Sequence, residues 1–375
     1  MHVLIAALHR PVKPTGVCRH AVNLALCLIE REEVTKVTLV IGAWQVDYFK
    51  TAFWLNSDKI QLTAVDIKNS SISRNLWFLW GLPKLANANN PDIVHLSFPF
   101  PIFRFLFKAP VVSTIHDLYS YECPENFGFP QVWFNRLFLK QCIDNSHGLT
   151  CVSQVTEDKL KLYFPNCHRK KAVEVVYNYV DFGEILPKQP QQLDSDSRFI
   201  LSVAQHRQNK NLALTIRAYH SLLQGNKLDS KTSLVIVGSK GPETDSLQRL
   251  ITELNLESSV VFLSGVADSE LLWLYKNCLL FVIASSTEGF CLPLVEALQF
   301  ANTVVCSDIP IFKEVGSDSC NYFYLSGNSL ENLSFAIQRS LTHAILKKSD
   351  RVEIFGKGAV AKKYVSFYRN LVKTN

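Results

Sequence analysis

The sequence predicts an α/β protein made of two Rossmann-like domains. Short, continuously apolar runs alternate along the chain with segments of helical spacing, as in parallel sheets that are buried between helices. At 375 residues the chain is long enough for two such domains. Hydrophobic residues make up 47% of it and charged residues 19%, so two substantial cores are possible and wholesale disorder is not expected.

Cysteine usage indicates a reduced compartment, and the lengths of the apolar runs predict neither a signal peptide nor a transmembrane helix. The ten cysteines are scattered from Cys18 to Cys320 without a C-x-x-C pair, which argues against a zinc site or a disulfide framework. The apolar run at residues 2–7 is too short for a signal peptide, and no run approaches the roughly 18 residues that a transmembrane helix needs. We therefore expect a cytoplasmic protein, either soluble or peripheral at the inner face of the membrane.

The positive charge lies mainly in the first half of the chain. The formal net charge is +6, and residues 1–175 hold 19 Lys and Arg against 14 Asp and Glu. This excess is too small and diffuse to indicate nucleic acid. It is compatible with an anionic membrane surface or an anionic acceptor.

Four strands are predicted within the first 96 residues, at residues 3–7, 37–41, 60–67 and 93–96. Gly16 stands between the first strand and the first predicted helix. At such a position backbone N–H groups can bind phosphate with the aid of the helix dipole, and the alternative is an ordinary turn glycine. The chain has no G-x-G-x-x-G motif there, so an NAD-type oxidoreductase is not favoured.

Two aromatic stretches stand out in this half, at residues 77–80 and 98–107. Core packing is the interpretation we favour for them. Because Arg104 and Lys108 accompany the second stretch, it also suits a surface that contacts lipid headgroups or an acceptor tail. Both interpretations stay open at this point.

His116 and Asp117 directly follow residues 111–115, a predicted buried strand. Ligands of open α/β sheets bind beyond the carboxyl ends of the strands, so this histidine is at the expected ligand-binding edge. Taken alone, it would more often be a structural histidine. Asp117 either orients His116 or caps the next helix. The aromatic residues 119–134 that follow are predicted to form an acceptor-facing loop that leads into a helix.

A polar, turn-rich segment at residues 186–197 is the predicted domain boundary, so the domains are expected to cover residues 1–185 and 198–358. Asp194 and Asp196 form a D-x-D pair in it. Because no apolar strand precedes the pair, we interpret it as part of the linker and not as a metal site.

The second half opens with a predicted strand at residues 199–204, and Arg207 and Lys210 follow before the next helix. Cations between a strand end and a helix start are well placed to bind phosphate groups, and the alternative is a solvated loop. Further strands are predicted at residues 234–237, 260–263, 279–284 and 303–307. This alternation makes the second half Rossmann-like.

The predicted ligand-binding loop directly follows the apolar residues 279–284. Glu288 is expected at the rim of the sheet and Glu296 on the helix that comes next. Each carboxylate alone would more often be a surface charge. However, an apolar helix start rarely carries a carboxylate that has no partner or ligand, so we expect the pair to hold different parts of one ligand.

From Glu288 to Ala297 the chain follows the pattern E-G-F-x-L-P-x-x-E-A, and T-I-H-D-L surrounds His116. These motifs resemble those of the retaining glycosyltransferases of family 4, which have the GT-B fold of two Rossmann-like domains facing a central cleft. The resemblance implies that Glu288 contacts hydroxyl groups of the donor sugar, that His116 lies near this sugar, and that Glu296 binds the nucleotide ribose.

The resemblance adds further expectations for the site. Gly16 would lie near the donor diphosphate, and the remaining substrate-binding positions would be Asp117, Gly289, Phe290, Cys291 and Leu292. The sequence departs from the family pattern at Cys291, where Gly is usual, and at Gln205, where an Arg is usual. Arg207 would then take over phosphate binding beside Lys210. In the family, a terminal helix, here residues 359–375, crosses back to the first domain.

The reaction implied by the resemblance transfers a sugar, of the mannose or glucose type, from a nucleoside diphosphate sugar to a glycan or lipid-linked acceptor in cell-surface polysaccharide biosynthesis. Arg207 and Lys210 would stabilise the charge that develops on the departing diphosphate. Neither a cofactor nor a metal ion is expected, and nucleic acid is not an expected partner. Two alternatives stay open: a nucleotide-sugar epimerase or phosphorylase of the same fold, and a non-catalytic module that binds sugar nucleotides.

Overall fold

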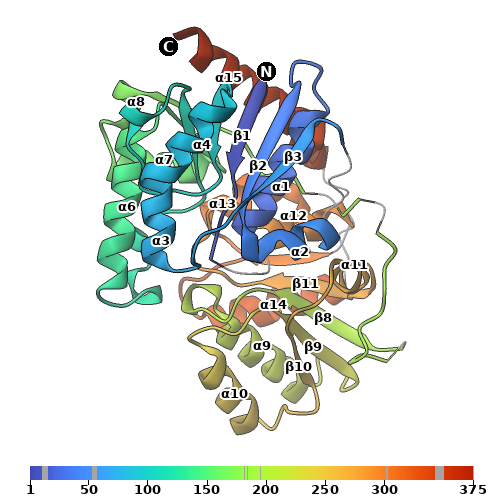
Figure 1. The fold of residues 1–375 in the computed structure, drawn as a ribbon. Coiled ribbons are helices and arrows are strands. Elements are labelled where there is room, and N and C mark those ends of the chain that lie inside the picture. The colour runs from blue at the N-terminus through green and yellow to red at the C-terminus, as the bar shows by residue number, and fades with distance from the viewer. Residues whose placement is uncertain are drawn as a thin grey trace. The chain divides into compact units, whose positions relative to one another are not determined.

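The computed structural model describes residues 1–10, 16–52, 57–180, 182–183, 185–194, 196–300, 303–342 and 350–374. The chain forms two compact units, one of Met1–Tyr179 with Ile354–Asn375 and the other of Val180–Glu353 (Figure 1). The polar segment 186–197 therefore belongs to the second unit, and the division comes slightly earlier than the sequence predicted. Ser195 within this segment and Asn375 at the end of the terminal helix lie outside the described residues.

The first unit is built on a parallel sheet in the order β3-β2-β1-β4-β5-β6-β7. The chain proceeds from β1 through β2 to β3 and then returns to the other side of β1 with β4. This reversal creates a topological switch point between β1 and β4, the usual place for a ligand. The strands are β1 (His2–Ala6), β2 (Lys36–Gly42), β3 (Ile60–Val65), β4 (Ile93–Leu96), β5 (Val111–Ile115), β6 (Gly148–Cys151) and β7 (Ala172–Val175).

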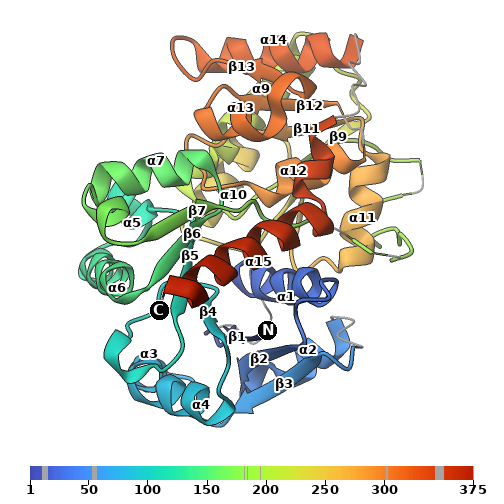
Figure 2. The same ribbon diagram turned by 90° about the horizontal axis from the view of Figure 1, so that it is seen from above.

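The two faces of this sheet are buried under different helices. Val3 and Ile5 pack with α1 (Gly16–Ile29) and α15 (Lys357–Thr374), which lie side by side in Figure 2. Leu4 and Ala6 point to the other face and pack with the π-helical turn η2 (Trp77–Gly81) and α4 (Leu82–Asn89). Burial on both faces explains why the strands are continuously apolar.

The terminal helix α15 is fixed to the first unit by polar contacts inside the core. The Tyr368 hydroxyl lies 2.8 Å from His95 Nδ1, and His95 Nε2 lies 2.9 Å from Thr114 Oγ1. Burial lowers the pKa of His95 to about 3, so the ring is neutral. Because 273 residues separate His95 from Tyr368, the contact ties the end of the chain to the sheet.

The other helices of the first unit surround these layers. Ser70 and Ser153 cap two of them, since their hydroxyls accept hydrogen bonds from the backbone N–H groups of Ser73 and Thr156. The helices are α2 (Val46–Ala52), α3 (Ser71–Leu76), α5 (Tyr119–Glu122), α6 (Gln131–Asn145), α7 (Gln154–Tyr163) and α8 (Cys167–Lys170), with 3-10 turns η1 (Ala43–Gln45), η3 (Arg104–Leu106) and η4 (Pro124–Asn126).

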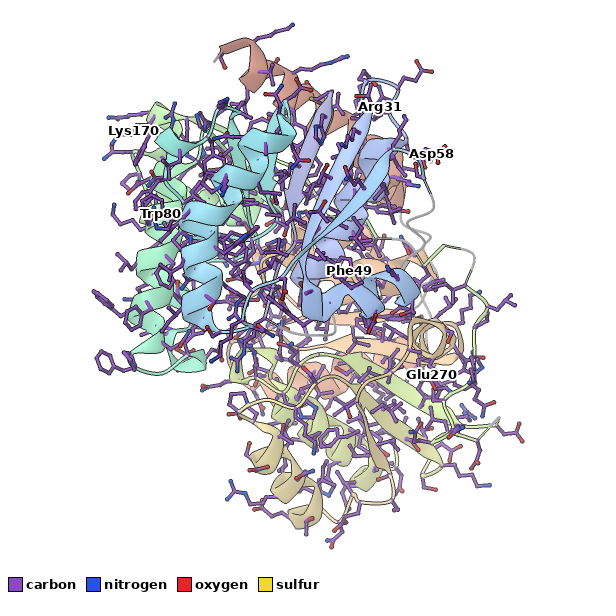
Figure 3. All side chains as sticks on the ribbon, viewed as in Figure 1. Arg31, Phe49, Asp58, Trp80, Lys170 and Glu270 are labelled. Carbon is purple, nitrogen blue, oxygen red and sulfur yellow. The ribbon has the colours of Figure 1, made fainter. Side chains whose placement is uncertain are left out.

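The two aromatic stretches divide between core and surface. Phe78, Ile102 and Phe107 belong to the apolar cluster under the sheet. In contrast, 57% of Trp80 and 78% of Phe105 are exposed. Figure 3 places Trp80 on the helical segment between α3 and α4. Core packing therefore accounts for part of each stretch, and a few exposed rings remain.

The second unit contains a parallel sheet in the order β10-β9-β8-β11-β12-β13. One face is covered by α9 (Leu212–Gln224), α10 (Thr244–Glu253) and α14 (Ser329–Thr342). On the other face, Tyr275 of α11 (Asp268–Asn277) packs on Phe281 with ring centroids 5.7 Å apart. The strands are β8 (Arg198–Val203), β9 (Thr232–Val237), β10 (Val260–Leu263), β11 (Leu280–Ile283), β12 (Val304–Ser307) and β13 (Asn321–Phe323), and the unit also contains α12 (Leu292–Gln299), α13 (Pro310–Gly316), η5 (Gln208–Lys210) and η6 (Ser317–Ser319).

These two parallel-sheet units confirm the predicted α/β class. The last 3-10 segment, η7 (Asp350–Phe355), leads into α15. In the part of the chain that the structure describes, no helix is long and apolar enough to cross a membrane.

Candidate functional site

A buried polar cluster of the second unit lies beyond the carboxyl ends of β8 and β11. Lys210 Nζ forms an ion pair with Glu288 Oε1 at 2.6 Å. The same oxygen accepts a hydrogen bond from Ser285 Oγ at 2.8 Å. Only 5% of Glu288 is exposed. A buried carboxylate therefore lies directly beside a cation at the ligand-binding edge of the sheet.

Hydrogen bonds to backbone carbonyl groups hold the two loops of this cluster together. Asn209 Nδ2 donates to the carbonyl of Thr287 at 3.2 Å, and the backbone N–H of Ser286 donates to the carbonyl of Asn209 at 2.8 Å. Asn211 Nδ2 reaches the carbonyl of Ala284 at 2.9 Å. Since β8 and β11 are neighbours in the sheet, these contacts bring Lys210 to Glu288 across 78 residues of sequence.

Sequence reasoning found both charges of this pair but missed the amides that position them. Asn209 and Asn211 flank Lys210 in the sequence, yet nothing in their spacing predicts the distant carbonyls that they bind. The tertiary structure alone identifies these partners.

Glu296 is also buried, on α12, with 5% of its surface exposed. Its Oε2 accepts a hydrogen bond from the hydroxyl of Tyr275 at 2.8 Å. Burial, and next the negative charge of Glu296, raise the pKa of Tyr275 well above its usual range, so the hydroxyl keeps its proton and acts as the donor. The sequence analysis did not identify Tyr275 as a site residue, because Tyr275 lies on α11, 21 residues before Glu296.

Cys291 stands immediately before α12 in a left-handed backbone conformation, with φ of 71° and ψ of 77°. A side chain makes this conformation unfavourable, whereas glycine adopts it readily. The usual glycine of the motif therefore has a geometric reason at this position. Gly289 and Phe290 are buried beside it, Leu292 is half-buried, and Pro293 occupies the first turn of α12.

Arg207 is half-buried on the loop after β8, and its guanidinium makes no ion pair or hydrogen bond with the residues that the structure describes. It is followed directly by η5, which carries Lys210. The loop packs closely on the one after β9, because a Cβ atom added at Gly238 would lie 1.9 Å from the carbonyl oxygen of Ala204. Gln205, at the position of the usual arginine, is exposed.

In the first unit, His116 lies beyond β5 at the carboxyl edge. Its Nε2 is 2.8 Å from the carbonyl oxygen of Ser97. A carbonyl oxygen can only accept, so Nε2 carries the hydrogen and Nδ1 is left as an acceptor. Burial lowers the pKa of His116 to about 4, which keeps the ring neutral near pH 7. Asp117 Oδ1 accepts a hydrogen bond at 3.1 Å from the backbone N–H of Tyr119, the first residue of α5.

Two further histidines surround His116. The ring of His20, on α1, lies 4.8 Å from that of His116 in an edge-to-face arrangement. His9 follows β1, and burial together with nearby Arg74 lowers its pKa to about 4. Gly16 is the first residue of α1. The rule that identified His116 also applies to His9, because His9 lies in the loop that follows the central strand β1.

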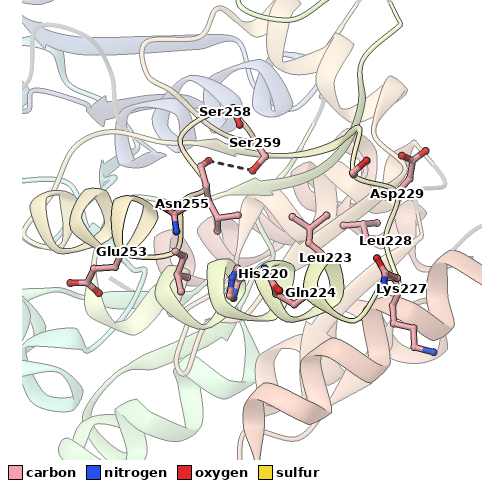
Figure 4. Close-up of a pocket in the computed structure, with 14 residues that line it drawn as sticks. His220, Leu223, Gln224, Lys227, Leu228, Asp229, Glu253, Asn255, Ser258 and Ser259 are labelled. Carbon is pink, nitrogen blue, oxygen red and sulfur yellow. Dashed lines mark hydrogen bonds between the residues drawn. The ribbon is translucent and has the colours of Figure 1, made fainter.

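No group of three or more His, Cys, Asp or Glu side chains suited to a metal ion occurs in the described ranges. A pocket of about 650 Å³ occurs elsewhere in the second unit (Figure 4). It is lined by the end of α9, the end of α10 and the turns that lead into β9 and β10. The pocket therefore lies at the amino ends of the strands, opposite the edge that carries Lys210 and Glu288.

Comparison with known proteins relates the whole chain to one group of enzymes. Residues 186–357 match the family described as glycosyl transferases group 1, and residues 14–184 match the one described as glycosyltransferase family 4. The O-antigen chain mannosyltransferase RfbU of Salmonella typhimurium is 25% identical over 316 residues, which cover 82% of either chain.

Solved structures with a similar fold cover the full length. Sucrose-phosphate synthase from Thermosynechococcus elongatus has a TM-score of 0.73 at 15% identity and covers 100% of both chains. Anabaena HepE in complex with UDP-glucose has a TM-score of 0.68 at 17% identity and covers 100% of this chain and 99% of that one. At these identities the likeness bears on the fold alone.

Proposed function

Because the chain belongs to glycosyltransferase family 4 and has the GT-B fold, we propose that it transfers a sugar from a nucleoside diphosphate sugar to a glycan or lipid-linked acceptor. Transfer proceeds with retention of configuration at the anomeric carbon. The observation that carries the proposal is the pair of buried carboxylates, Glu288 beside Lys210 and Glu296 beside Tyr275, at the ligand-binding edge of the second unit.

The two carboxylates suit the hydroxyl groups of a sugar nucleotide, since ionised carboxylates form strong hydrogen bonds with hydroxyl donors. In this proposal, Glu288 binds the sugar and Glu296 binds the ribose. Residues 289–292 line the donor site, and Gly16 lies near the diphosphate. Asp117 helps to shape the edge that carries His116 through its hydrogen bond with the backbone N–H of Tyr119.

Lys210 and Arg207 act on the leaving group. The bond between the anomeric carbon and the diphosphate oxygen breaks as the acceptor oxygen bonds to that carbon. The leaving phosphate takes the acceptor proton, and the two cations stabilise its negative charge. No metal ion or other cofactor takes part in this mechanism.

His116 has a defined part in the same proposal. Its ring is neutral and its Nδ1 is an acceptor, so it can receive a hydrogen bond from a sugar hydroxyl group and cannot donate one to it through this atom. It thus orients a substrate hydroxyl without adding positive charge.

The related enzyme named as an O-antigen chain mannosyltransferase supports mannose, or a sugar of similar type, as the group transferred. It also supports a role in the synthesis of a cell-surface polysaccharide. We place this reaction in the cytoplasm, at the inner face of the membrane, where a lipid-linked acceptor would be available.

The test measures transfer directly. UDP, GDP and ADP are first compared by calorimetry, and the corresponding mannose and glucose donors are then assayed with lipid-linked acceptors in excess EDTA. We expect binding of one diphosphate and undiminished transfer in EDTA, with a product of the same anomeric configuration as the donor. Inversion of configuration, or a loss of activity that added Mg²⁺ or Mn²⁺ restores, would contradict the mechanism.

A further inference from the structure

Eight of the exposed large apolar side chains of the first unit lie within residues 72–80, at residue 105 and within residues 129–137, and we call this group the aromatic face. Their exposed fractions range from 43% for Phe134 to 89% for Phe129. Single exposed apolar residues are common, but a grouping of this size on one unit marks an interaction surface. The aromatic face consists of Ile72, Leu76, Trp80, Phe105, Phe129, Trp133, Phe134 and Leu137.

Contacts within the first unit connect the parts of the aromatic face. Ile72, Leu76 and Trp80 are spaced by four residues along α3 and η2. Trp80 lies 5.6 Å from the ring of Phe103, which in turn stacks on Phe105 at 5.6 Å. The same loop is held against α6, because the backbone N–H of Ile102 donates to Gln141 Oε1 at 2.9 Å.

On α6 the apolar residues also share one side. Trp133 and Leu137 are one helical turn apart, and the rings of Trp133 and Phe134 lie 5.3 Å apart. Figures 1 and 2 both show α3 and α6 next to each other. The aromatic face therefore extends over neighbouring elements of one unit.

Basic residues outnumber acidic residues along these elements. Residues 72–84, 98–108 and 129–145 together contain six Lys and Arg and one acidic residue, Asp144. Lys84 is exposed one turn beyond Trp80, and Lys140 is exposed just beyond Leu137. Its ion pair with Asp144 is itself largely exposed, so Lys140 remains accessible to other anions. The occupant that complements this surface is apolar and anionic.

We propose that the aromatic face docks the enzyme on the surface of an anionic lipid bilayer. Tryptophan and phenylalanine rings enter the headgroup region, while lysine and arginine attract anionic lipids. The inference rests on the proposed function, because a lipid-linked acceptor is presented at such a surface. Arg136 supports this link, since its Nε donates to the carbonyl of Ser120 at 2.7 Å and so ties α6 to the segment that follows His116.

The test uses vesicles of phosphatidylcholine alone and vesicles that also contain phosphatidylglycerol, at low and high salt. The aromatic variant combines Trp80→Gln, Phe129→Gln and Trp133→Gln, and the charge variant combines Lys84→Glu and Lys140→Glu. Phe335→Gln is the matched control, because Phe335 is 66% exposed on α14 of the second unit. All these side chains are on the surface, so the variants should fold.

We expect the wild-type protein to bind the phosphatidylglycerol vesicles and to be released by salt. The aromatic and charge variants should each lose about tenfold or more in partitioning, whereas the control should match the wild type. Docking is overturned if the wild type ignores these vesicles or if the aromatic variant binds them like the control. Equal binding to phosphatidylcholine alone would overturn the anionic part.

Two parallel measurements separate the other outcomes. If light scattering shows a wild-type oligomer that the aromatic variant disperses, and vesicles have no effect, the aromatic face is a contact between copies and the proposal is overturned. Calorimetry with the nucleoside diphosphate should give the same affinity in every variant. If the wild-type protein binds the vesicles but binds no nucleoside diphosphate, the proposed function is contradicted and the docking surface is still supported.

Discussion

Glu288 and Glu296 are equally buried, at 5% exposed each, but their partners differ. Glu288 is paired with the cation Lys210, whereas Glu296 accepts from the neutral hydroxyl of Tyr275. A diphosphate that binds Lys210 competes with the Glu288 carboxylate for the same ammonium group. The Tyr275 hydroxyl at Glu296 is uncharged, so the two residues should respond differently to loss of charge.

The predicted outcome is that Glu296→Gln weakens binding of the bare nucleoside diphosphate, while Glu288→Gln does not. The ribose hydroxyls are present in every nucleotide, and a lost charge-assisted hydrogen bond costs about 1.5–3 kcal/mol, or roughly 10- to 150-fold. Glu288→Gln instead releases Lys210 for the diphosphate and impairs sugar transfer. Calorimetry set beside turnover rates measures both effects.

Two variants control this comparison. Glu257→Gln removes an exposed carboxylate of the same unit and should change neither quantity. Tyr275→Phe should reproduce part of the Glu296→Gln effect on nucleotide affinity, because it removes the hydroxyl that holds Glu296 Oε2. Equal losses of diphosphate affinity in the two glutamate variants would refute the separate roles.

At the scale of elements, α15 is the clearest case of a helix held by specific contacts. Its apolar side packs on the same cluster as α1, and Tyr368 adds a buried hydrogen bond to His95. The neighbouring Tyr364 hydroxyl is near Thr114 and Thr150, but without the geometry of a hydrogen bond. The helix α15 therefore carries one buried tyrosine whose hydroxyl makes a hydrogen bond and one whose hydroxyl does not.

We predict that Tyr368→Phe lowers the free energy of unfolding by about 1–3 kcal/mol, because it leaves His95 Nδ1 buried without a partner. Tyr364→Phe is the matched control and should cost clearly less. Urea denaturation of both variants measures the difference. Equal destabilisation by the two substitutions would show that the Tyr368–His95 bond contributes nothing specific.

At the scale of the whole molecule, the buried histidines make stability depend on pH. Burial lowers the pKa of His9 and His116 to about 4 and that of His95 to about 3, compared with 6.5 for an unburied histidine. Between these values the unfolded chain binds protons that the folded chain does not. Stability is therefore complete above pH 6.5 and is lost as the pH falls toward 4.

The expected result is a fall in the free energy of unfolding between pH 6.5 and pH 5, at constant ionic strength. These three groups give a limiting slope of about 4 kcal/mol per pH unit, and His20 and His147, whose pKa values burial also lowers, add to it. Urea titrations at several pH values measure this slope, and His9→Gln should reduce it by the contribution of one proton. A stability that stays constant over this range would refute the burial of neutral histidines.

The sequence by itself determined the class of the fold and predicted the edge of the sheet at which the candidate site lies. Strands such as β1 and β11 are apolar because both faces of a parallel sheet are covered, and this pattern is visible in a few consecutive residues. The loop with Glu288 and the position of His116 follow from the rule that ligands bind beyond the carboxyl ends of strands. Both are local signals.

Only the tertiary structure decided which residues meet. Lys210 and Glu288 are 78 residues apart, and His95 and Tyr368 are 273 apart. The tertiary structure also placed the boundary between the two units before Val180. It divided the aromatic residues 98–107 between core and surface. The physical reason is that strand order and the packing of helices on each face bring distant segments together, and neither is encoded in the spacing of neighbouring residues.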